Sequence, residues 1–309
     1  MADLVIGKNI NISYEKALPS IIYDRRYSEK DGHIIITAKY LPTVNHSESF
    51  CDITKDSNKI HRKHPEFGEA VSPALLQSSV ASILAKELIK YVGENPIDFP
   101  YSSSESKSVK PVVTGFEYEV ESRINPHFEG FLAAYTEIRN NKGKVYFSLY
   151  HVYCDGNHDI KFILDAADPV HRTIFTREKA LEFGRMIGSE SSESNLYSLA
   201  AASSVVADAV DRGVLSLDEG IIALYTEQQV TADTSHSMDL KKGIHLDLFL
   251  SDKARFGKNL EQGETVGMQI LARDNKGKLI YVLKSPLAFP REGLLEAAIK
   301  REMRSRNRK

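Results

Sequence analysis

Two long segments, residues 72–93 and 194–213, carry apolar or small side chains around most of a helical circumference. Their sequences are SPALLQSSVASILAKELIKYVG and SNLYSLAAASSVVADAVDRG. The first begins at a Ser-Pro pair suited to a helix start, and the two end at Gly93 and Gly213. A helix that is apolar on nearly all sides is buried, not laid on a surface. The sequence therefore predicts two buried helices, each enclosed by other elements.

Strand-like runs surround both helices. Ahead of the first are SIIYDRRY and HIIITAKYL, joined by the turn SEKDG; behind it are VVTGFEYEVES, GFLAAYTEIR and KVYFSLYHVY. The second is followed by GIIALYTEQQVTA, GIHLDLFLS, TVGMQILAR and KLIYVLKSPL. A shorter helix is expected over about 176–187 and an amphipathic segment at the C-terminus. The polar stretches 41–67 and 102–108 (SSSESKS) predict irregular loops.

The order of elements indicates an internal duplication. Residues 139–144 (RNNKGK) lead into VYFSL, and residues 273–278 (RDNKGK) lead into LIYVL. Ser-Ser-Val at 78–80 also matches Ser-Ser-Val at 203–205. Because Asn-Lys-Gly turns are common in hairpins, such matches also arise by chance, and an unrelated α+β sandwich is the alternative. The shared order of helix and strands favours two halves, residues 1–160 and 161–309.

Composition narrows the class of protein. Of 309 residues, 42% are hydrophobic and 27% charged, and the net charge is −2, so bulk electrostatics argue against binding to nucleic acid. No apolar run is long enough to span a membrane and no signal peptide is recognised, which predicts a cytoplasmic protein. For the two cysteines, Cys51 and Cys154, reduced thiols are expected, with a disulfide between them as the alternative. Neither a P-loop nor a dinucleotide fingerprint is present, so no cofactor is expected.

One long buried helix wrapped by a curved antiparallel sheet resembles the hotdog fold, and two such halves in tandem resemble a double hotdog. The expected fold class is therefore α+β, a tandem hotdog. A short motif extends the resemblance: His64, Gly68 and Pro73 in HPEFGEAVSP have the spacing H-x3-G-x4-P. The dehydratase domains of fatty-acid and polyketide synthases carry this motif just before their first central helix. Proteins of this fold mostly act on acyl thioesters of coenzyme A or an acyl carrier protein.

The resemblance implies roles for these residues. His64 would be the base of a 3-hydroxyacyl dehydratase, since a histidine is half-ionised near neutral pH. Gly68 and Pro73 would shape the site for the thioester carbonyl at the helix N-terminus. The acid is open: Asp208 lies late on the second long helix, and Glu69 lies in the loop.

Further candidates for the acid are weaker. Glu193 precedes the second helix, and Ser79 occupies the position at which single-hotdog dehydratases carry a glutamate. A thioesterase would need only a residue that directs a water, for which Glu69, Asn195 and Glu227 are candidates. The expected activity is therefore a dehydratase, a hydratase or a thioesterase.

Two other functions stay open. His61 and His64, with Glu66 or Glu69 near them, have metal-ligand spacing, but the cations and proline of HRKHPE favour a solvated loop and no metal. The C-terminus is basic and is either a solvated tail or a surface for an acidic partner. A non-catalytic hotdog component of a larger assembly is the alternative to an enzyme, and the chain is a possible homodimer.

Overall fold

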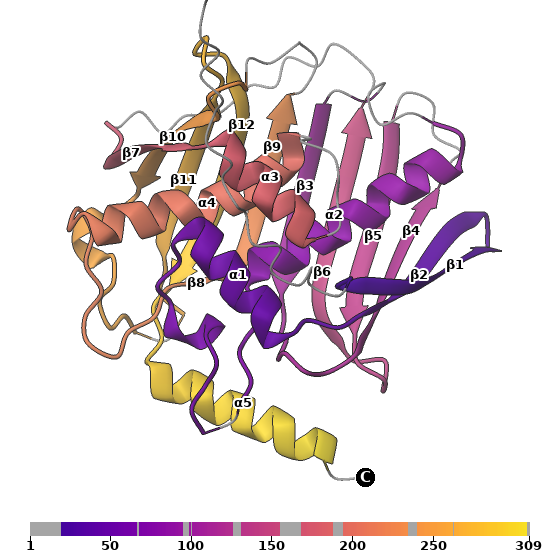
Figure 1. Cartoon of the computed structure of the whole chain (residues 1–309), viewed down its shortest axis with the longest axis horizontal. Coiled ribbons are helices and arrows are strands. Elements are labelled where there is room, and N and C mark those ends of the chain that lie inside the picture. The colour runs from indigo at the N-terminus through magenta and orange to yellow at the C-terminus, as the bar shows by residue number, and fades with distance from the viewer. Residues whose placement is uncertain are drawn as a thin grey trace, which may run out of the picture.

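A single twisted antiparallel sheet with helices on one face forms the body of the molecule (Figure 1). The computed structural model describes residues 20–66, 68–94, 99, 101–125, 131–154, 168–187, 194–233, 240–261 and 263–307. The first strands are β1 (Ile22–Lys30), β2 (His33–Tyr40), β3 (Tyr101–Ser108), β4 (Tyr118–Asn125), β5 (Phe131–Arg139) and β6 (Val145–Cys154). The later ones are β7 (His171–Phe175), β8 (Leu224–Tyr225), β9 (Glu227–Asp233), β10 (Ile244–Leu250), β11 (Val266–Arg273) and β12 (Leu279–Ala288).

Five α-helices accompany these strands in the described part of the chain. They are α1 (Val44–Thr54), α2 (Ala74–Tyr91), α3 (Arg177–Met186), α4 (Ser194–Asp211) and α5 (Glu292–Asn307). Two short 3-10 helices, η1 (Lys59–His61) and η3 (Lys253–Arg255), lie between longer elements. In Figure 1, α1 to α4 lie over the same face of the sheet, and α5 runs along its lower edge.

The two halves of the sheet repeat one topology. In chain order β2, α2, β3, β4, β5 and β6 give the sheet order β2-β4-β5-β6-β3, and β7, α4, β9, β10, β11 and β12 give β7-β10-β11-β12-β9. The halves join where β3 pairs with β9 in antiparallel register, with Ser104 opposite Val230. The division at residues 160 and 161 falls outside the described residues, so those boundaries stay a prediction.

The repeated turn RNNKGK and RDNKGK occupies the same place in each half, between β5 and β6 and between β11 and β12. The first side chain after the arginine, Asn140 or Asp274, accepts hydrogen bonds from the backbone N–H groups two and four residues later, at 2.9–3.0 Å. The pairing register shifts beside the turn in both hairpins. The Ser-Ser-Val match is less regular, because Ser78 is the fifth residue of α2 and Ser203 the tenth of α4.

Both long helices are buried as predicted. Helix α2 packs on β2, β4, β5 and β6, and α4 packs on β7, β10 and β12. Fully buried apolar residues of these helices include Leu76, Val80, Leu84, Leu88, Ala200, Ala201 and Val205. The alanines of α4 give it a thin apolar surface, which lets the helix approach the sheet and α2 closely.

Two segments predicted as loops are regular elements. The serine-rich stretch 102–108 belongs to β3, which pairs with β6 on one side and β9 on the other. Full pairing on both sides outweighs the low strand propensity of serine. Within 41–67 lies α1, whose N-cap is Thr43; the side chains of Thr43 and His46 form a capping box. This helix buries Phe50, and its three apolar residues near the C-terminal end were too few for a periodic signal.

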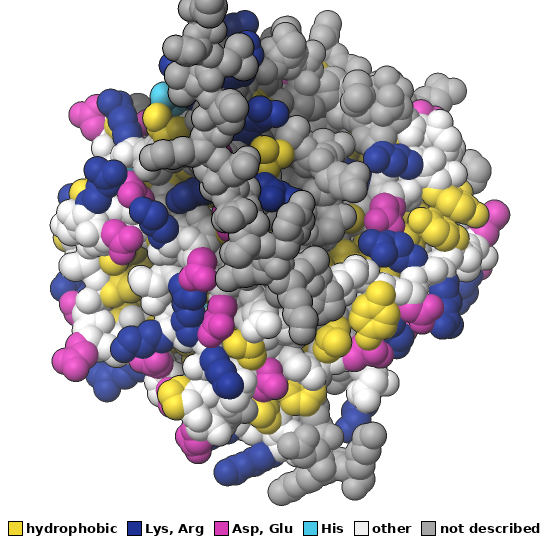
Figure 2. Space-filling view, viewed as in Figure 1, with side chains coloured by type: hydrophobic (Ala, Val, Ile, Leu, Met, Phe, Trp, Pro, Cys, Tyr) yellow, Lys and Arg dark blue, Asp and Glu magenta, His cyan; other side chains and the backbone are white. Residues whose placement is uncertain are grey.

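The structure also bears on the expectations about the cysteines, membrane spans, metal sites and surface charge. Cys51 and Cys154 are both thiols. None of the described helices is long and apolar enough to cross a membrane. Over the same residues, no cluster of three or more histidine, cysteine, aspartate or glutamate side chains could hold a metal ion. Acidic and basic side chains are interspersed on the face seen in Figure 2, in keeping with the small net charge.

Gly243, at the start of β10, provides a stability test of the second half. Its φ is +104°, and a Cβ there would overlap the carbonyl oxygen of Phe175. We expect Gly243→Ala to lower the free energy of unfolding by at least about 2 kcal/mol, from steric overlap and left-handed strain together. Gly263 has a φ of +90° with nothing within 4 Å of an added Cβ, so Gly263→Ala measures the strain alone. Urea unfolding of both variants checks this; equal losses would contradict it.

Candidate active site

The connection between α1 and α2 folds into a compact loop at the N-terminus of α2. Helix α1 ends at Lys55, which has a left-handed φ of 60°. The Asp56 carboxylate then accepts a hydrogen bond from the Asn58 backbone N–H at 2.9 Å, and the Asn58 side chain caps η1 by accepting from Ile60 N–H. Such side-chain-to-backbone turns hold a loop without regular structure. They set the positions of Asp56 and His61.

His61 is buried, with 8% of its surface exposed. Its Nδ1 lies 2.7 Å from the carbonyl oxygen of Val71, and its own carbonyl accepts a hydrogen bond from Ser47 Oγ, also at 2.7 Å. Because a carbonyl oxygen only accepts, Nδ1 carries the hydrogen. The neutral ring therefore has its lone pair on Nε2, which makes this nitrogen available as a base.

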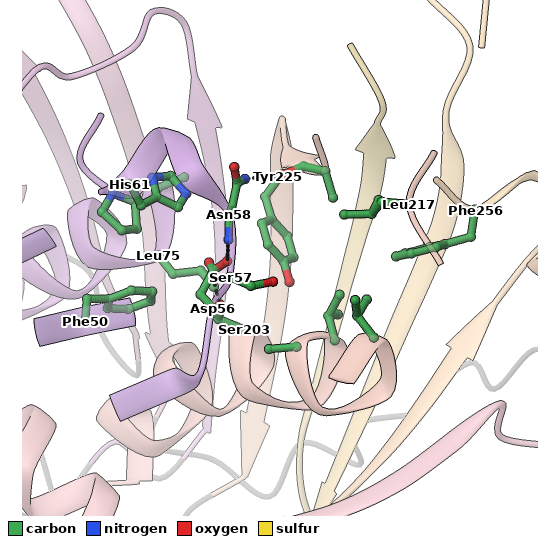
Figure 3. Close-up of a pocket in the computed structure, with 16 residues that line it drawn as sticks. Phe50, Asp56, Ser57, Asn58, His61, Leu75, Ser203, Leu217, Tyr225 and Phe256 are labelled. Carbon is green, nitrogen blue, oxygen red and sulfur yellow. Dashed lines mark hydrogen bonds between the residues drawn. The ribbon is translucent and has the colours of Figure 1, made fainter. Parts of the chain in front are cut away.

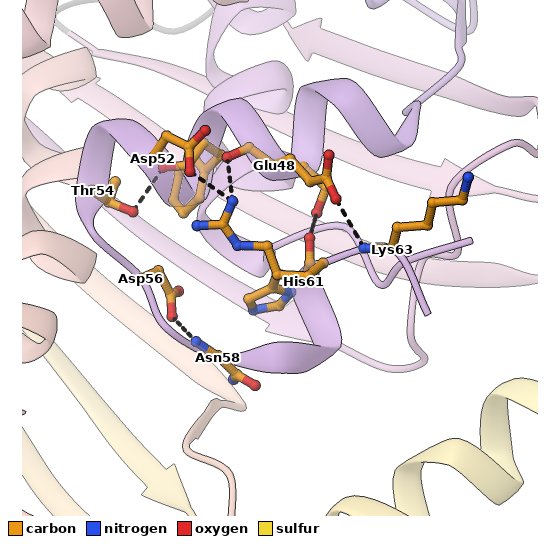
Figure 4. A network of polar contacts seen from close by, with 10 residues as sticks. Glu48, Asp52, Thr54, Asp56, Asn58, His61 and Lys63 are labelled. Atoms are coloured by element: carbon orange, nitrogen blue, oxygen red, sulfur yellow. Dashed lines mark hydrogen bonds and ion pairs between the residues drawn. The ribbon is translucent and has the colours of Figure 1, made fainter. Parts of the chain in front are cut away.

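Charged side chains connect the outer side of the loop between α1 and α2 to helix α1 (Figure 4). Arg62 pairs with Asp52 of α1 at 2.6 Å, and Glu48 of α1 accepts a hydrogen bond from the Lys63 backbone N–H at 3.1 Å. The cations of this polar stretch thus point to α1 and the surface. His61, which precedes them in sequence, points inward.

The second half of the chain supplies the other wall of the site. Ser203 Oγ of α4 donates a hydrogen bond to the second carboxylate oxygen of Asp56 at 3.1 Å. Asn58 Nδ2 donates to the carbonyl oxygen of Ala223, just before β8, at 3.1 Å. The Asp56 carboxylate is thereby held by donors from both halves, the Asn58 backbone N–H and Ser203 Oγ.

Asp56, Asn58, His61 and Ser203 line one cavity of about 50 Å³ (Figure 3). Since one water occupies about 30 Å³ of the liquid, this volume suits one or two water-sized groups. Most of the remaining wall is apolar, including Phe50 and several residues of α4. A carboxylate and an imidazole thus belong to the lining of one water-sized cavity.

The N-terminus of α2 closes the cavity. Pro73, Ala74 and Leu75 belong to its lining, and no side chain caps the helix at Pro73. The first backbone N–H groups of a helix have no partner within the helix and carry partial positive charge. This end of α2 can therefore stabilise negative charge on an oxygen that enters the cavity.

A second cavity, of about 180 Å³, adjoins the first at His61. We call the first the inner cavity and the second the outer cavity. His61, Ala74 and Tyr225 line both. The outer cavity reaches the surface at Val109, which is 52% exposed. Burial, with a contribution from the Asp56 charge, raises the pKa of Tyr225, so its phenol stays a hydrogen-bond donor at neutral pH.

The sequence matches no family model and no curated protein. Solved structures match over most of the chain. A MaoC-like dehydratase has a TM-score of 0.52 and 12% identity, covering 85% of this chain and 97% of its own. A bifunctional dehydratase-cyclase domain in ambruticin biosynthesis has a TM-score of 0.51 and 11% identity, and the match covers 90% of this chain and 98% of that domain. A 12:0-ACP thioesterase from Umbellularia californica has a TM-score of 0.52 and 8% identity, and the match covers 83% of this chain and 94% of the thioesterase.

The fold is a double hotdog. This confirms the α+β tandem arrangement expected from the sequence, and the resemblance to dehydratases and thioesterases holds at the level of the fold. Identities this low carry no residue roles from those proteins to this chain.

Of the three residues of the predicted H-x3-G-x4-P motif, only Pro73 lines a cavity. His64 Nε2 is 3.2 Å from a carboxylate oxygen of Glu296 on α5, and the Gly68 N–H donates to the His64 carbonyl at 2.9 Å. Glu69 accepts a hydrogen bond from Thr114 Oγ1 at 2.6 Å. Neither His64, Gly68 nor Glu69 lines the inner or the outer cavity, whereas Pro73 lines the inner one. The catalytic role of His64 stays a prediction.

Asp208, predicted as the acid, lies on the side of α4 that faces β7. It pairs with His171 Nε2 at 2.8 Å and with Arg212 Nε at 3.0 Å. Burial acts to raise the pKa of Asp208, but hydrogen bonds from His171, Arg212 and Thr173 outweigh it and hold the pKa below its usual value. A carboxylate in this state is a poor proton donor, and Asp208 lines neither cavity.

The remaining candidates lie apart from the cavities. Glu227 pairs with Lys107 at 2.8 Å, and Ser79 donates to the Leu75 carbonyl within α2. Glu193 and the side chain of Asn195 lie outside the described residues.

Asp56 and Asn58 were not among the predicted site residues, and His61 was considered only as a metal ligand. The run KDSNKIHRKHPE is rich in cations, which favoured a solvated loop. The available signal was Ile60, an apolar residue inside this run, which is 8% exposed and packs under α5. Its burial orients the adjacent His61 into the molecule.

Proposed function

We propose that this chain catalyses the hydration of 2-enoyl thioesters and the reverse dehydration of 3-hydroxyacyl thioesters, with His61 as the general base and acid and Asp56 as its partner that orients the water. One observation carries the proposal: a carboxylate, an imidazole with a free Nε2 and an uncapped helix N-terminus line one water-sized cavity. Hydration needs these three groups. Two of the structurally similar proteins are described as a dehydratase and a dehydratase-cyclase domain.

In this mechanism the thioester carbonyl oxygen lies against the first N–H groups of α2. The carboxylate of Asp56 orients a water, and His61 Nε2 removes one of its protons as the water oxygen bonds to Cβ. The electron pair of the C=C bond moves to form an enolate, whose negative oxygen the helix N-terminus stabilises. The imidazolium of His61 then returns the proton to Cα. The sum is one water added across the double bond, and dehydration is the reverse.

A thioesterase is the second candidate. The same water, directed at the carbonyl carbon, would cleave the thioester and release a free thiol. The structural similarity to a protein described as an acyl-ACP thioesterase supports keeping it. The distinction depends on which carbon lies above the water, so the products decide between the two reactions.

Incubation of the protein with crotonyl-CoA and with a crotonyl-carrier protein tests the proposal. We expect the conjugated enoyl absorbance to fall to an equilibrium value with 3-hydroxybutyryl thioester as product and no free thiol. Release of free thiol with crotonate as the product, in place of 3-hydroxybutyryl thioester, would replace hydration by thioester hydrolysis. If neither change occurs with a range of chain lengths on both carriers, the proposal is wrong and a non-catalytic role gains support.

A further inference from the structure

The Tyr225 side chain lies where the inner and outer cavities adjoin. It lines both of them, as do His61 and Ala74. In Figure 3 its hydroxyl end points into the inner cavity, on the side where Asp56 and Ser57 lie. Among the residues that the structure describes, this hydroxyl has no hydrogen-bond partner. Because an enclosed tyrosine hydroxyl normally has a partner, this one is suited to donate to a ligand in the cavity.

The backbone around Tyr225 is held from three sides. Strand β8, which contains Tyr225, pairs with β12 in antiparallel register. The carbonyl oxygen of the next residue, Thr226, accepts a hydrogen bond from the Ser108 N–H at 3.1 Å. The carbonyl oxygen of Ala223 accepts one from Asn58 Nδ2, also at 3.1 Å. The hydroxyl is therefore fixed relative to the loop between α1 and α2, which carries the proposed functional side chains.

The Tyr225 hydroxyl is a donor beside a carboxylate that other groups already hold. Burial, followed by the charge of Asp56, raises the pKa of Tyr225, so the phenol keeps its proton at neutral pH. Asp56 accepts its hydrogen bonds from the Asn58 N–H and from Ser203 Oγ instead. A third group between Tyr225 and Asp56 can accept from the phenol and donate to the carboxylate. Water and an alcohol both do so, whereas a carbonyl oxygen cannot donate.

We propose that the Tyr225 hydroxyl donates a hydrogen bond to the oxygen that is added to, or leaves from, Cβ of the substrate. This inference rests on the proposed function. There, the water directs one hydrogen to the Asp56 carboxylate and gives the other to His61 Nε2. Of its two lone pairs, one forms the bond to Cβ, and the other accepts from Tyr225. The hydrogen bonds of the water are then complete, and the attacking lone pair has one direction.

The same contact assists dehydration. As the bond between Cβ and the hydroxyl oxygen breaks, its electron pair moves onto that oxygen, which takes the proton from the His61 imidazolium and leaves as water. Tyr225 keeps its own proton throughout. Its hydrogen bond strengthens as negative charge grows on the departing oxygen, so it stabilises the transition state more than the bound substrate. The contact is therefore expected to act on kcat and not on KM.

Tyr225→Phe removes the hydroxyl and keeps the ring. We expect kcat for crotonyl-CoA hydration to fall about 10- to 100-fold, the effect of losing one hydrogen bond to a developing charge, with KM changed by no more than about twofold. Tyr281→Phe is the matched control, since the Tyr281 hydroxyl is buried without a partner among the described residues and lines neither cavity. Its kinetics should match those of the wild type, and melting temperatures show whether both variants keep the fold.

Hydrogen exchange at Cα of butyryl-CoA in D2O, followed by NMR, locates the contact on the substrate. In the proposed mechanism this exchange uses His61 and the N-terminus of α2, but butyryl-CoA has no oxygen at Cβ. Tyr225→Phe should therefore exchange at the wild-type rate, whereas His61→Asn should lose exchange together with hydration. Slower exchange in Tyr225→Phe would place its hydroxyl on the thioester carbonyl and overturn the inference.

Failure of the inference and failure of the proposed function give different results. Unchanged crotonyl-CoA hydration in Tyr225→Phe, or an equal loss in Tyr281→Phe, overturns the role of Tyr225 and leaves hydration by the wild-type chain intact. Absence of hydration in the wild type with every enoyl thioester overturns the proposed function, and the inference with it.

Discussion

Replacement of His61 by asparagine is expected to lower kcat for crotonyl-CoA hydration by about 100-fold or more, the usual contribution of a general base. Asparagine can still donate a hydrogen bond to the Val71 carbonyl, as His61 Nδ1 does at 2.7 Å, so the loop should keep its conformation. What the variant lacks is the lone pair of Nε2. Initial rates at saturating substrate measure the loss, and an unchanged circular dichroism spectrum and melting temperature show that the fold is retained.

His64→Ala is the matched control, since His64 lies three residues further along the same loop. Its ring contacts Glu296 of α5 at the surface, with 26% of the side chain exposed. We expect hydration to change by no more than about twofold, since His64 lines neither cavity and a partly exposed surface pair contributes little energy. The opposite result, with activity lost in His64→Ala and kept in His61→Asn, would make His64 the base, as the sequence motif predicted.

Asp56→Asn tests the second member of the pair. Asparagine Oδ1 can accept from the Asn58 N–H, as Asp56 Oδ1 does at 2.9 Å, and its Nδ2 can donate to Ser203 Oγ, which donates to Asp56 Oδ2 at 3.1 Å in the wild type and accepts in the variant. The variant therefore removes the charge with little change in geometry. We expect Asp56→Asn to lower kcat about 100-fold. Because Asp56 and His61 act on one water, the double variant with His61→Asn should lose far less activity than the two single losses multiplied together. Additive losses would contradict that shared role.

Acidification is expected to destabilise the protein through His151 of β6. Burial, followed by the charge of Lys86, lowers the pKa of His151 to about 3 from an ordinary value near 6.5. Between these values the unfolded chain binds a proton that the folded chain does not, so stability falls as the pH falls. The expected slope is about 1.4 kcal/mol per pH unit below pH 6.5, or about 3 kcal/mol by pH 4.5. Urea unfolding at a series of pH values measures it.

His151→Phe isolates this contribution. Phenylalanine can keep the stacking on Tyr153, whose ring lies 4.0 Å from that of His151 between centroids, and it does not titrate. In this variant the free energy of unfolding should fall less steeply with pH, by about 1.4 kcal/mol per pH unit between pH 6.5 and 4.5. His245→Gln, at an exposed position of β10, should keep the wild-type slope. An unchanged slope in His151→Phe would mean that His151 takes up its proton in the folded state.

Local pattern predicted the elements that carry most of the fold. The two buried helices were recognisable because most positions of α2 and α4 are apolar or small. The hairpin repeats were recognisable because Asn140 and Asp274 make the same backbone contacts in each half, so the same letters recur. Both signals arise within a few neighbouring residues, where sequence and structure correspond directly.

The elements that the sequence pattern missed depend on distant partners. Nothing local makes SSSESKS a strand; β3 is one because β6 and β9 supply hydrogen bonds on both sides. The same holds for the candidate site. The short motif predicted His64 and Pro73, and of these only Pro73 lines the inner cavity.

The sequence by itself determined two long buried helices among antiparallel strands, with a repeated turn, and hence the double hotdog. Only the tertiary structure decided which side chains face the water-sized cavity. Asp56 reaches its place through Ser203 of α4, and His61 through Val71 and the burial of Ile60 beneath α5. Helix and turn formation are governed by neighbours along the chain, whereas the direction of a loop side chain is governed by whatever the rest of the molecule packs against it.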